Sequence, residues 1–287
     1  MDELDFTSPR APTLKQAPPA PIYNAAVAME FFRHGGKPEA FAQGATIFAE
    51  NEKASRLLLQ RDKMYLLLAG EVNLVAKNRV LGTVKIGEIF GEMAAISDSP
   101  RSATAVAKTA CSVLSIDERS FHGALQKKPE FALMLMGLMI ARLRAMLGRA
   151  GGAQTRPGAG ESTVFDKALL AALAKGLGEQ ATVRYTRGAS IFSEGQAGLL
   201  MYVVVQGRVA IAMKGVIVQH VGPGGVFGEM ALVDQAPRMA GAAAETDCTL
   251  LALNRQVFLN LVKAGPEFAA SLLAAVAERV RAVAGRA

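Results

Sequence analysis

The stretch Gly-Glu-Ile-Phe-Gly-Glu-Met-Ala at residues 87–94 recurs almost unchanged as Gly-Gly-Val-Phe-Gly-Glu-Met-Ala at residues 224–231. In each copy a Pro-Arg-x-Ala run follows, and its arginine (Arg101 or Arg238) lies nine positions after Glu92 or Glu229. A glycine-bounded turn with free N–H groups, one carboxylate and one arginine form a compact site for a ligand that carries both hydroxyls and a phosphate. Two such sites in one chain favour a ligand sensor over a catalyst.

These two stretches are part of a longer internal repeat, which sets the architecture. Identical residues recur 137 positions apart at Cys111 and Cys248, Phe121 and Phe258, Pro129 and Pro266, and Arg142 and Arg279. Upstream the offset is 144, at Gly44 and Gly188, Phe48 and Phe192, and Glu50 and Glu194. The difference of seven predicts a longer loop around 51–60 in the first copy. An offset that persists over more than fifty residues indicates a tandem duplication.

The length of 287 residues suits two domains of ordinary size. The composition predicts a disordered, proline-rich N-terminal tail over 1–21 and a flexible, glycine-rich linker over 150–164. Domain A is expected over 22–149 and domain B over 165–287. Because the second copy ends where its counterpart ends, no helix-turn-helix is expected after either copy.

Within each copy the pattern changes from strand-like to helical. Short β-rich segments at intervals of about ten residues predict strands over 45–49, 64–69, 72–75, 79–85, 103–108, 112–116, 201–205, 209–213 and 216–221. Asp117 and Asn254 are good N-caps for a short helix, and a second helix should start near Pro129 or Pro266. The predicted fold class is mainly β with α: two tandem antiparallel β-roll (jelly-roll) domains, each followed by C-terminal helices.

The loop chemistry gives each residue of the motif an expected task. Gly91 and Gly228 permit a backbone conformation that a side chain would block, and the residues after them are set to begin a helical turn whose N–H groups attract an anion. Arg101 and Arg238 can make forked bonds to phosphate oxygens. Glu92 and Glu229 would then accept bonds from a neighbouring hydroxyl. The alternative is that each Glu simply pairs with its Arg on a surface loop.

With these motifs, the chain resembles the cyclic nucleotide-binding domain family, which includes the catabolite activator protein and protein kinase A regulatory subunits. The resemblance covers the chain from about residue 22 to 287, twice. It implies that Arg101 and Arg238 hold the cyclic phosphate and that Glu92 and Glu229 hold the ribose 2′-hydroxyl. The backbone of Gly91, Glu92 and Met93, and of Gly228, Glu229 and Met230, would complete each cradle, and the final helix of each copy would close over the purine.

Two departures leave the base open. Ser102 follows the first arginine and can bond phosphate or a guanine amino group, whereas Met239 follows the second and can do neither. The last helices carry Met146, Leu147, Val283 and Ala284 where catabolite-activator-like members place hydroxyls. The expected ligand is therefore a cyclic nucleotide, with cAMP favoured over cGMP because it is the commoner ligand in the family.

The composition excludes several classes of protein. No apolar stretch reaches the length of a membrane-spanning helix, and no signal pattern opens the chain. Cys111 and Cys248 read as core residues of strands, and with three scattered histidines they make no metal site. We expect no catalytic residues, no metal and no cofactor. We expect a cytoplasmic location. The net charge of +7 does not by itself predict nucleic-acid binding, because no recognition helix is visible.

The signal is expected to leave through the final helices toward an unidentified effector protein. The helix over 131–146 is apolar on nearly all sides, which suits an interdomain core helix or a lid and homodimer seam with adaptable methionines. We therefore expect a non-enzymatic cyclic nucleotide sensor. The rivals are a scaffold protein with degenerate sites, a DNA-binding regulator, and a sensor of cyclic di-GMP.

Overall fold

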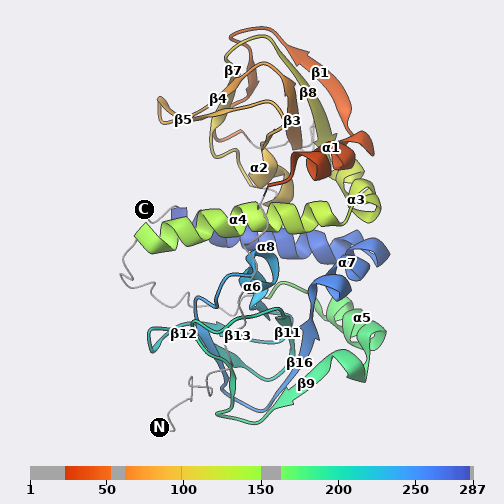
Figure 1. The fold of residues 1–287 in the computed structure, drawn as a ribbon, viewed down its shortest axis with the longest axis vertical. Coiled ribbons are helices and arrows are strands. Elements are labelled where there is room, and N and C mark those ends of the chain that lie inside the picture. Colours follow the sequence, from red (N-terminus) through yellow and green to blue (C-terminus); the bar gives the residue numbers. More distant parts are fainter. Residues whose placement is uncertain (1–22, 53–61, 98, 150–162, 285–287) are drawn as a thin grey trace. The chain divides into compact units, whose positions relative to one another are not determined.

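The structure, a computed structural model, describes residues 23–52, 62–97, 99–149 and 163–284 (Figure 1). The predictions for the tail (1–21), and for most of the longer loop (51–60) and the linker (150–164), lie outside these residues, as do the side chains of Leu147 and Ala284.

In the first repeat, the helix α1 (Ala25–Arg33) is followed along the chain by two four-stranded antiparallel sheets. One sheet has the order β1-β8-β3-β6 and consists of β1 (Lys37–Phe41), β8 (Cys111–Asp117), β3 (Lys63–Ala69) and β6 (Ile89–Phe90). The other has the order β2-β7-β4-β5 and consists of β2 (Thr46–Phe48), β7 (Thr104–Ala107), β4 (Val72–Ala76) and β5 (Arg79–Val84). The short helix α2 (Glu92–Ser97) interrupts the strands between β6 and β7.

The second repeat has the same topology, after α5 (Lys167–Leu177) and a 3₁₀ turn, η1 (Glu179–Ala181). Its first sheet has the order β14-β11-β16-β9, with β14 (Val226–Phe227), β11 (Met201–Gln206), β16 (Cys248–Leu253) and β9 (Thr182–Tyr185). Its second sheet has the order β10-β15-β12-β13, with β10 (Ser190–Phe192), β15 (Gly241–Ala244), β12 (Val209–Met213) and β13 (Val216–Val221). The short helix α6 (Glu229–Asp234) corresponds to α2. Read from β9, the first sheet has the order β9-β16-β11-β14, which matches β1-β8-β3-β6, and the second sheets match directly. This equal strand order confirms the duplication and the predicted fold class.

The predicted helix starts are also confirmed. The Asp117 carboxylate accepts from the N–H of Ser120 at 2.9 Å and caps α3 (Glu118–Lys127), and the Asn254 amide oxygen accepts from Val257 at 2.9 Å at the start of α7 (Arg255–Ala264). The long helices α4 (Glu130–Arg149) and α8 (Pro266–Ala284) follow, as the two prolines predicted. The described helices include none that alone is long and apolar enough for a membrane span; α7 and α8 up to Val283 meet that test only as a pair bent by 117°.

Several elements have no counterpart among the predicted ranges, including α1, β1, α5 and β9. Strand β1 is largely exposed and contains Pro38, so it lacks the alternating apolar pattern of a half-buried strand. It forms because its backbone pairs with β8, from Lys37 opposite Ser115 to Phe41 opposite Cys111. Tertiary pairing, not local preference, makes this edge strand.

An aromatic cluster fills the centre of each β-roll. Tyr65 stacks on Phe90 with ring centroids 5.1 Å apart, and Phe48 lies beside both rings. Tyr202 and Phe227 repeat this arrangement at 5.2 Å, with Phe192 beside them. Burial raises the pKa of Tyr65 and of Tyr202 to about 12. Cys111 and Cys248 are buried free thiols within these clusters, as predicted.

The described residues divide into two compact units. One combines the first β-roll (Tyr23–Met136) with Leu261–Ala282, and the other contains Gly137–Asn260 with the second β-roll. Each compact unit therefore contains the β-roll of one sequence repeat together with most of the last helix of the other repeat. On α4, Met134, Met136 and Met139 are buried and Met146 is half-buried. That burial agrees with a core helix, and the lid or dimer seam stays a prediction.

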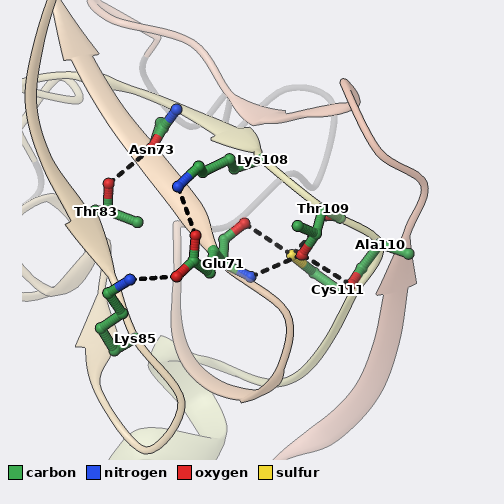
Figure 2. A network of polar contacts seen from close by, with 8 residues as sticks. All are labelled: Glu71, Asn73, Thr83, Lys85, Lys108, Thr109, Ala110 and Cys111. Atoms are coloured by element: carbon green, nitrogen blue, oxygen red, sulfur yellow. Dashed lines mark hydrogen bonds and ion pairs between the residues drawn. The ribbon is translucent and has the colours of Figure 1, made fainter.

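A surface network joins the turn before β4 to its neighbours (Figure 2). The Glu71 carboxylate bonds Lys108 at 2.6 Å and also Lys85, while its backbone carbonyl accepts from the Cys111 thiol at 3.3 Å. In the second repeat the positions of Glu71 and Lys108 hold Arg208 and Glu245, and these pair at 2.8 Å. The ion pair is thus retained with its charges reversed, which independently supports the alignment of the two copies.

We expect Glu71→Gln to flatten the acid side of the stability profile. Lys108 and then Lys85 lower the pKa of Glu71 from 4.5 to about 2. A carboxylate whose pKa is lower in the folded state stabilises the fold above pH 4.5, and this contribution is lost as the pH falls toward 2. Urea unfolding of wild type and variant across this range should show the variant less sensitive to pH.

The difference should be small and should shrink in about 1 M salt, because surface ion pairs are weak and screened. Glu118→Gln, an exposed charge removal outside the network, is the matched control. Identical pH profiles for wild type and Glu71→Gln would contradict the assignment.

Candidate functional site

Each candidate site is built around one glycine at the end of a two-residue strand. Gly91 follows β6 and Gly228 follows β14, with φ of 74° and 76°. The helices α2 and α6 begin at the next residue, Glu92 or Glu229. The prediction that these glycines adopt a conformation unfavourable for other residues is confirmed. The predicted helical turn after each glycine is confirmed as well.

Space as well as conformation requires glycine here. A Cβ at Gly91 would lie 3.0 Å from Nη1 of Arg101, and a Cβ at Gly228 would lie 2.7 Å from Nη1 of Arg238. The turn therefore approaches the guanidinium closely enough for its own carbonyl to accept a hydrogen bond.

Arg101 is buried, with 6% of its surface exposed. Its Nη1 donates to the Gly91 carbonyl at 2.8 Å and its Nη2 to the Lys63 carbonyl at 2.9 Å, while the Asp62 carboxylate lies 3.3 Å from Nη2. The guanidinium carbon lies 4.2 Å from the centre of the Phe48 ring, within the range of a cation–π contact. These contacts hold the arginine beside the turn and below the surface.

Arg238 repeats this geometry in the second copy, with the same 6% exposure. Its Nη1 donates to the Gly228 carbonyl at 2.6 Å, its Nη2 donates to the Leu200 carbonyl at 2.7 Å, and its guanidinium carbon lies 4.1 Å from the Phe192 ring centre. Its Nε is buried and has no hydrogen-bond partner among the described residues. Burial lowers the pKa of Arg238, and the neighbouring Tyr202 and Glu229 oppose that shift.

These contacts leave donors for an anion. A guanidinium has five N–H groups, and the two carbonyls occupy two of them. A buried positive charge with an unmatched Nε–H carries a desolvation cost that an incoming anion would offset.

The two glutamates are also buried, with 5% of Glu92 and 4% of Glu229 exposed. The glutamates and the arginines are all buried, so neither copy places them on an exposed surface loop. The role of Glu92 and Glu229 as acceptors for a ligand hydroxyl stays a prediction.

The sequence comparison agrees with this geometry. A sequence model described as "Cyclic nucleotide-binding domain" matches residues 38–128 and 182–264, together more than half of the chain. The chain belongs to the cyclic nucleotide-binding domain family. The two matched regions each include one glycine turn, one buried glutamate and one buried arginine.

Two curated relatives and one solved structure illustrate the likeness. A cAMP-dependent protein kinase regulatory subunit of Eremothecium gossypii is 29% identical over 207 residues, covering 70% of this chain and 40% of the relative. A cyclic AMP receptor protein of Thermus thermophilus is 38% identical over 102 residues, covering 34% of this chain and 47% of the relative. The cAMP-bound regulatory domain of Toxoplasma gondii protein kinase A is 21% identical with a TM-score of 0.30, covering 88% of this chain and 87% of that one. The chain thus spans less than half the length of the two curated relatives.

The two motifs, which we call the first cassette (Gly91, Glu92 and Arg101) and the second cassette (Gly228, Glu229 and Arg238), differ beside the arginine. The position of Asp62 in the first copy is occupied by the exposed Leu199 in the second. Gly198 packs so tightly over Arg238 that any Cβ there would collide with the guanidinium. The sequence analysis missed Asp62 and Gly198 because it compared what the copies share, and here they differ.

The remaining predicted site residues lie around the two turns with varied exposure. Met93, Met230 and Met239 are half-buried, while Ser102 is exposed. Among the described residues, no group of three or more His, Cys, Asp or Glu side chains could hold a metal ion. The assignment of these residues to ligand contacts stays a prediction.

Gly91→Ala should displace the Arg101 guanidinium, because the new Cβ would lie within 3.0 Å of Nη1. The φ of 74° should add a destabilisation of about 1–2 kcal/mol. Gly44→Ala is the matched control, since Gly44 has a φ of 81° and nothing within 4 Å of its Cβ position. Both variants should lose stability in urea, but only Gly91→Ala should shift the side-chain NMR signal of Arg101. An unchanged Arg101 signal would contradict this geometry.

Proposed function

We propose that the chain is a regulatory protein, not an enzyme, that binds a cyclic nucleotide in each of its two cassettes and relays occupancy to a separate protein partner. The observation that carries the proposal is that both copies have the same arrangement of glycine, glutamate and arginine. Arg101 and Arg238 occupy the same position beside a positive-φ glycine, each with a buried glutamate on the next short helix. A duplicated polar arrangement that both copies keep is expected when both serve the same ligand class.

In this proposal the arginines bind the cyclic phosphate through the N–H groups that face away from the carbonyls. Glu92 and Glu229 accept the ribose 2′-hydroxyl, and the backbone from each glycine to Met93 or Met230 completes the cradle. The names of the relatives, a cAMP-dependent kinase subunit and a cyclic AMP receptor, favour cAMP over cGMP. Ser102 and Met239 are the residues that should make the two cassettes unequal.

The relay to a partner rests on the final helices. A ligand shifts a conformational equilibrium only through different affinities for two states. Helices α4 and α8 are the candidates for the element that moves, and the kinase regulatory relative supports a protein as receiver of the signal. A cytoplasmic location fits this role.

Arg101→Ala and Arg238→Ala should each remove one binding event and leave the other. Losing a charge-assisted bond to a buried phosphate costs at least about 1.5–3 kcal/mol, or roughly tenfold or more in affinity. Calorimetry of wild type, both single variants and the double variant against cAMP, cGMP and cyclic di-GMP tests this. A double variant that binds cAMP as tightly as wild type would refute the cassette assignment. A wild type that binds none of the three ligands would favour a scaffold with degenerate sites, and one that binds only cyclic di-GMP would change the ligand class.

Ser102→Ala should weaken cGMP more than cAMP at the first cassette, because its hydroxyl can reach a guanine amino group as well as the phosphate. The measurement uses the Arg238→Ala background, so that only the first cassette reports. Met239→Ser is the reciprocal change for the second cassette, in the Arg101→Ala background. Equal loss for both ligands would assign Ser102 to the phosphate alone.

A further inference from the structure

An arginine near the end of the chain contacts the first cassette. Nη2 of Arg281, on α8, donates to the carbonyl of Pro100 at 3.2 Å, a bond between residues 181 positions apart. Pro100 immediately precedes Arg101, and Arg281 and Pro100 both lie in the compact unit that contains the first β-roll. The final helix of the second repeat thus brings a cation to the phosphate-binding loop of the first.

The surroundings of Arg281 suit an additional negative charge. Its Nε is buried and has no hydrogen-bond partner among the described residues. Burial lowers the pKa of Arg281, and the charges of Asp62 and Glu278 oppose this shift. Asp62 is the same carboxylate that lies 3.3 Å from Arg101. The Asp62 carboxylate therefore acts on both guanidinium groups, and Glu278 is the second carboxylate whose charge acts on Arg281.

We propose that Arg281 is a positioning residue of the first cassette, which holds α8 against the loop at Pro100 and strengthens the binding of an anionic ligand at Arg101. This inference rests on the proposed function, and it adds a contribution from the second repeat to the first site. An anion at Arg101 adds a negative charge near Asp62, so the field at Arg281 becomes more favourable for its cation. Ligand at the first cassette and docking of α8 should stabilise each other by the same factor, because coupling is reciprocal.

Two features make Arg281 specific to the first cassette. Asp62, which links it electrostatically to Arg101, has Leu199 at the corresponding position of the second repeat. The residue that corresponds to Arg281 in the first repeat is Arg144, on α4 from Gly137 onward, which belongs to the other compact unit. Arg144 therefore serves as a matched control: the same charge on the equivalent helix, in a different unit.

The experiment measures first-cassette affinity in the full chain with Arg238→Ala, so that the second cassette is silent. Arg281→Gln, Arg281→Lys and Arg144→Gln are added to this background and titrated with cAMP at low and high salt. The neutral nucleoside adenosine, titrated by NMR, is the uncharged probe. We expect Arg281→Gln to weaken cAMP by about three- to tenfold at low salt, the range for a partly exposed charge acting on an anion. Arg281→Lys should restore most of this loss, and the salt dependence of cAMP binding should decrease in Arg281→Gln.

Adenosine affinity should be the same with and without Arg281→Gln, and Arg144→Gln should leave cAMP affinity unchanged. An equal loss for cAMP and adenosine, with unchanged salt dependence, would assign Arg281 a purely structural role and overturn the inference. No loss of cAMP affinity, or an equal loss in Arg144→Gln, would overturn it as well. If the Arg238→Ala parent fails to bind cAMP while Arg101→Ala binds it, the proposed function of the first cassette fails instead, and the inference with it.

Discussion

The burial of one guanidinium in each β-roll constrains everything around it. A charged group with only 6% exposure persists in the fold when its donors are matched, because removing a partner from a buried charge costs about 3–5 kcal/mol. The carbonyl of Gly91 or Gly228 can face the guanidinium only from a backbone with positive φ, and the second carbonyl comes from the start of β3 or the residue before β11. An aromatic ring then covers the flat face of the cation. This packing explains why glycine, phenylalanine and arginine recur at the same spacing in both copies of the sequence.

The recurring spacing of these residues explains how much of the fold could be predicted from the sequence. Because the arginine, its glycine and its ring lie in three different segments of each β-roll, a fixed offset between the copies indicates a fixed arrangement of those segments. The strand-like segments, the caps at Asp117 and Asn254 and the long helices after Pro129 and Pro266 followed from the same alignment. The edge strands β1 and β9 did not follow, since their structure comes from backbone pairing with β8 and β16. The repeat could not predict that each last helix packs in the compact unit of the other β-roll, because both copies have the same helix at the same position in the sequence.

The site itself was predictable only where the copies agree. Gly91, Glu92 and Arg101 have identical counterparts, so their combination stood out in the sequence. Asp62 and Gly198 surround the same guanidinium but lie where the copies differ. The pairs Glu71–Lys108 and Arg208–Glu245 illustrate the general reason. An interaction can be retained while both residue types change, and a search for identical residues then finds nothing.

In the proposed function, the differences beside the two arginines should give the two cassettes different free energies of anion binding. In the first, the Asp62 carboxylate already neutralises part of the charge of Arg101, so an incoming anion must compete with it. In the second, Leu199 supplies no charge, and Arg238 keeps an unmatched Nε–H beneath Gly198. An anion there meets a stronger field, but the backbone at Gly198 must move before it can reach Nε. We therefore expect anion binding to be opposed by the Asp62 carboxylate at the first cassette and by a local rearrangement at Gly198 at the second. A duplication that preserved the motif has therefore left the two guanidinium groups in different electrostatic and steric surroundings.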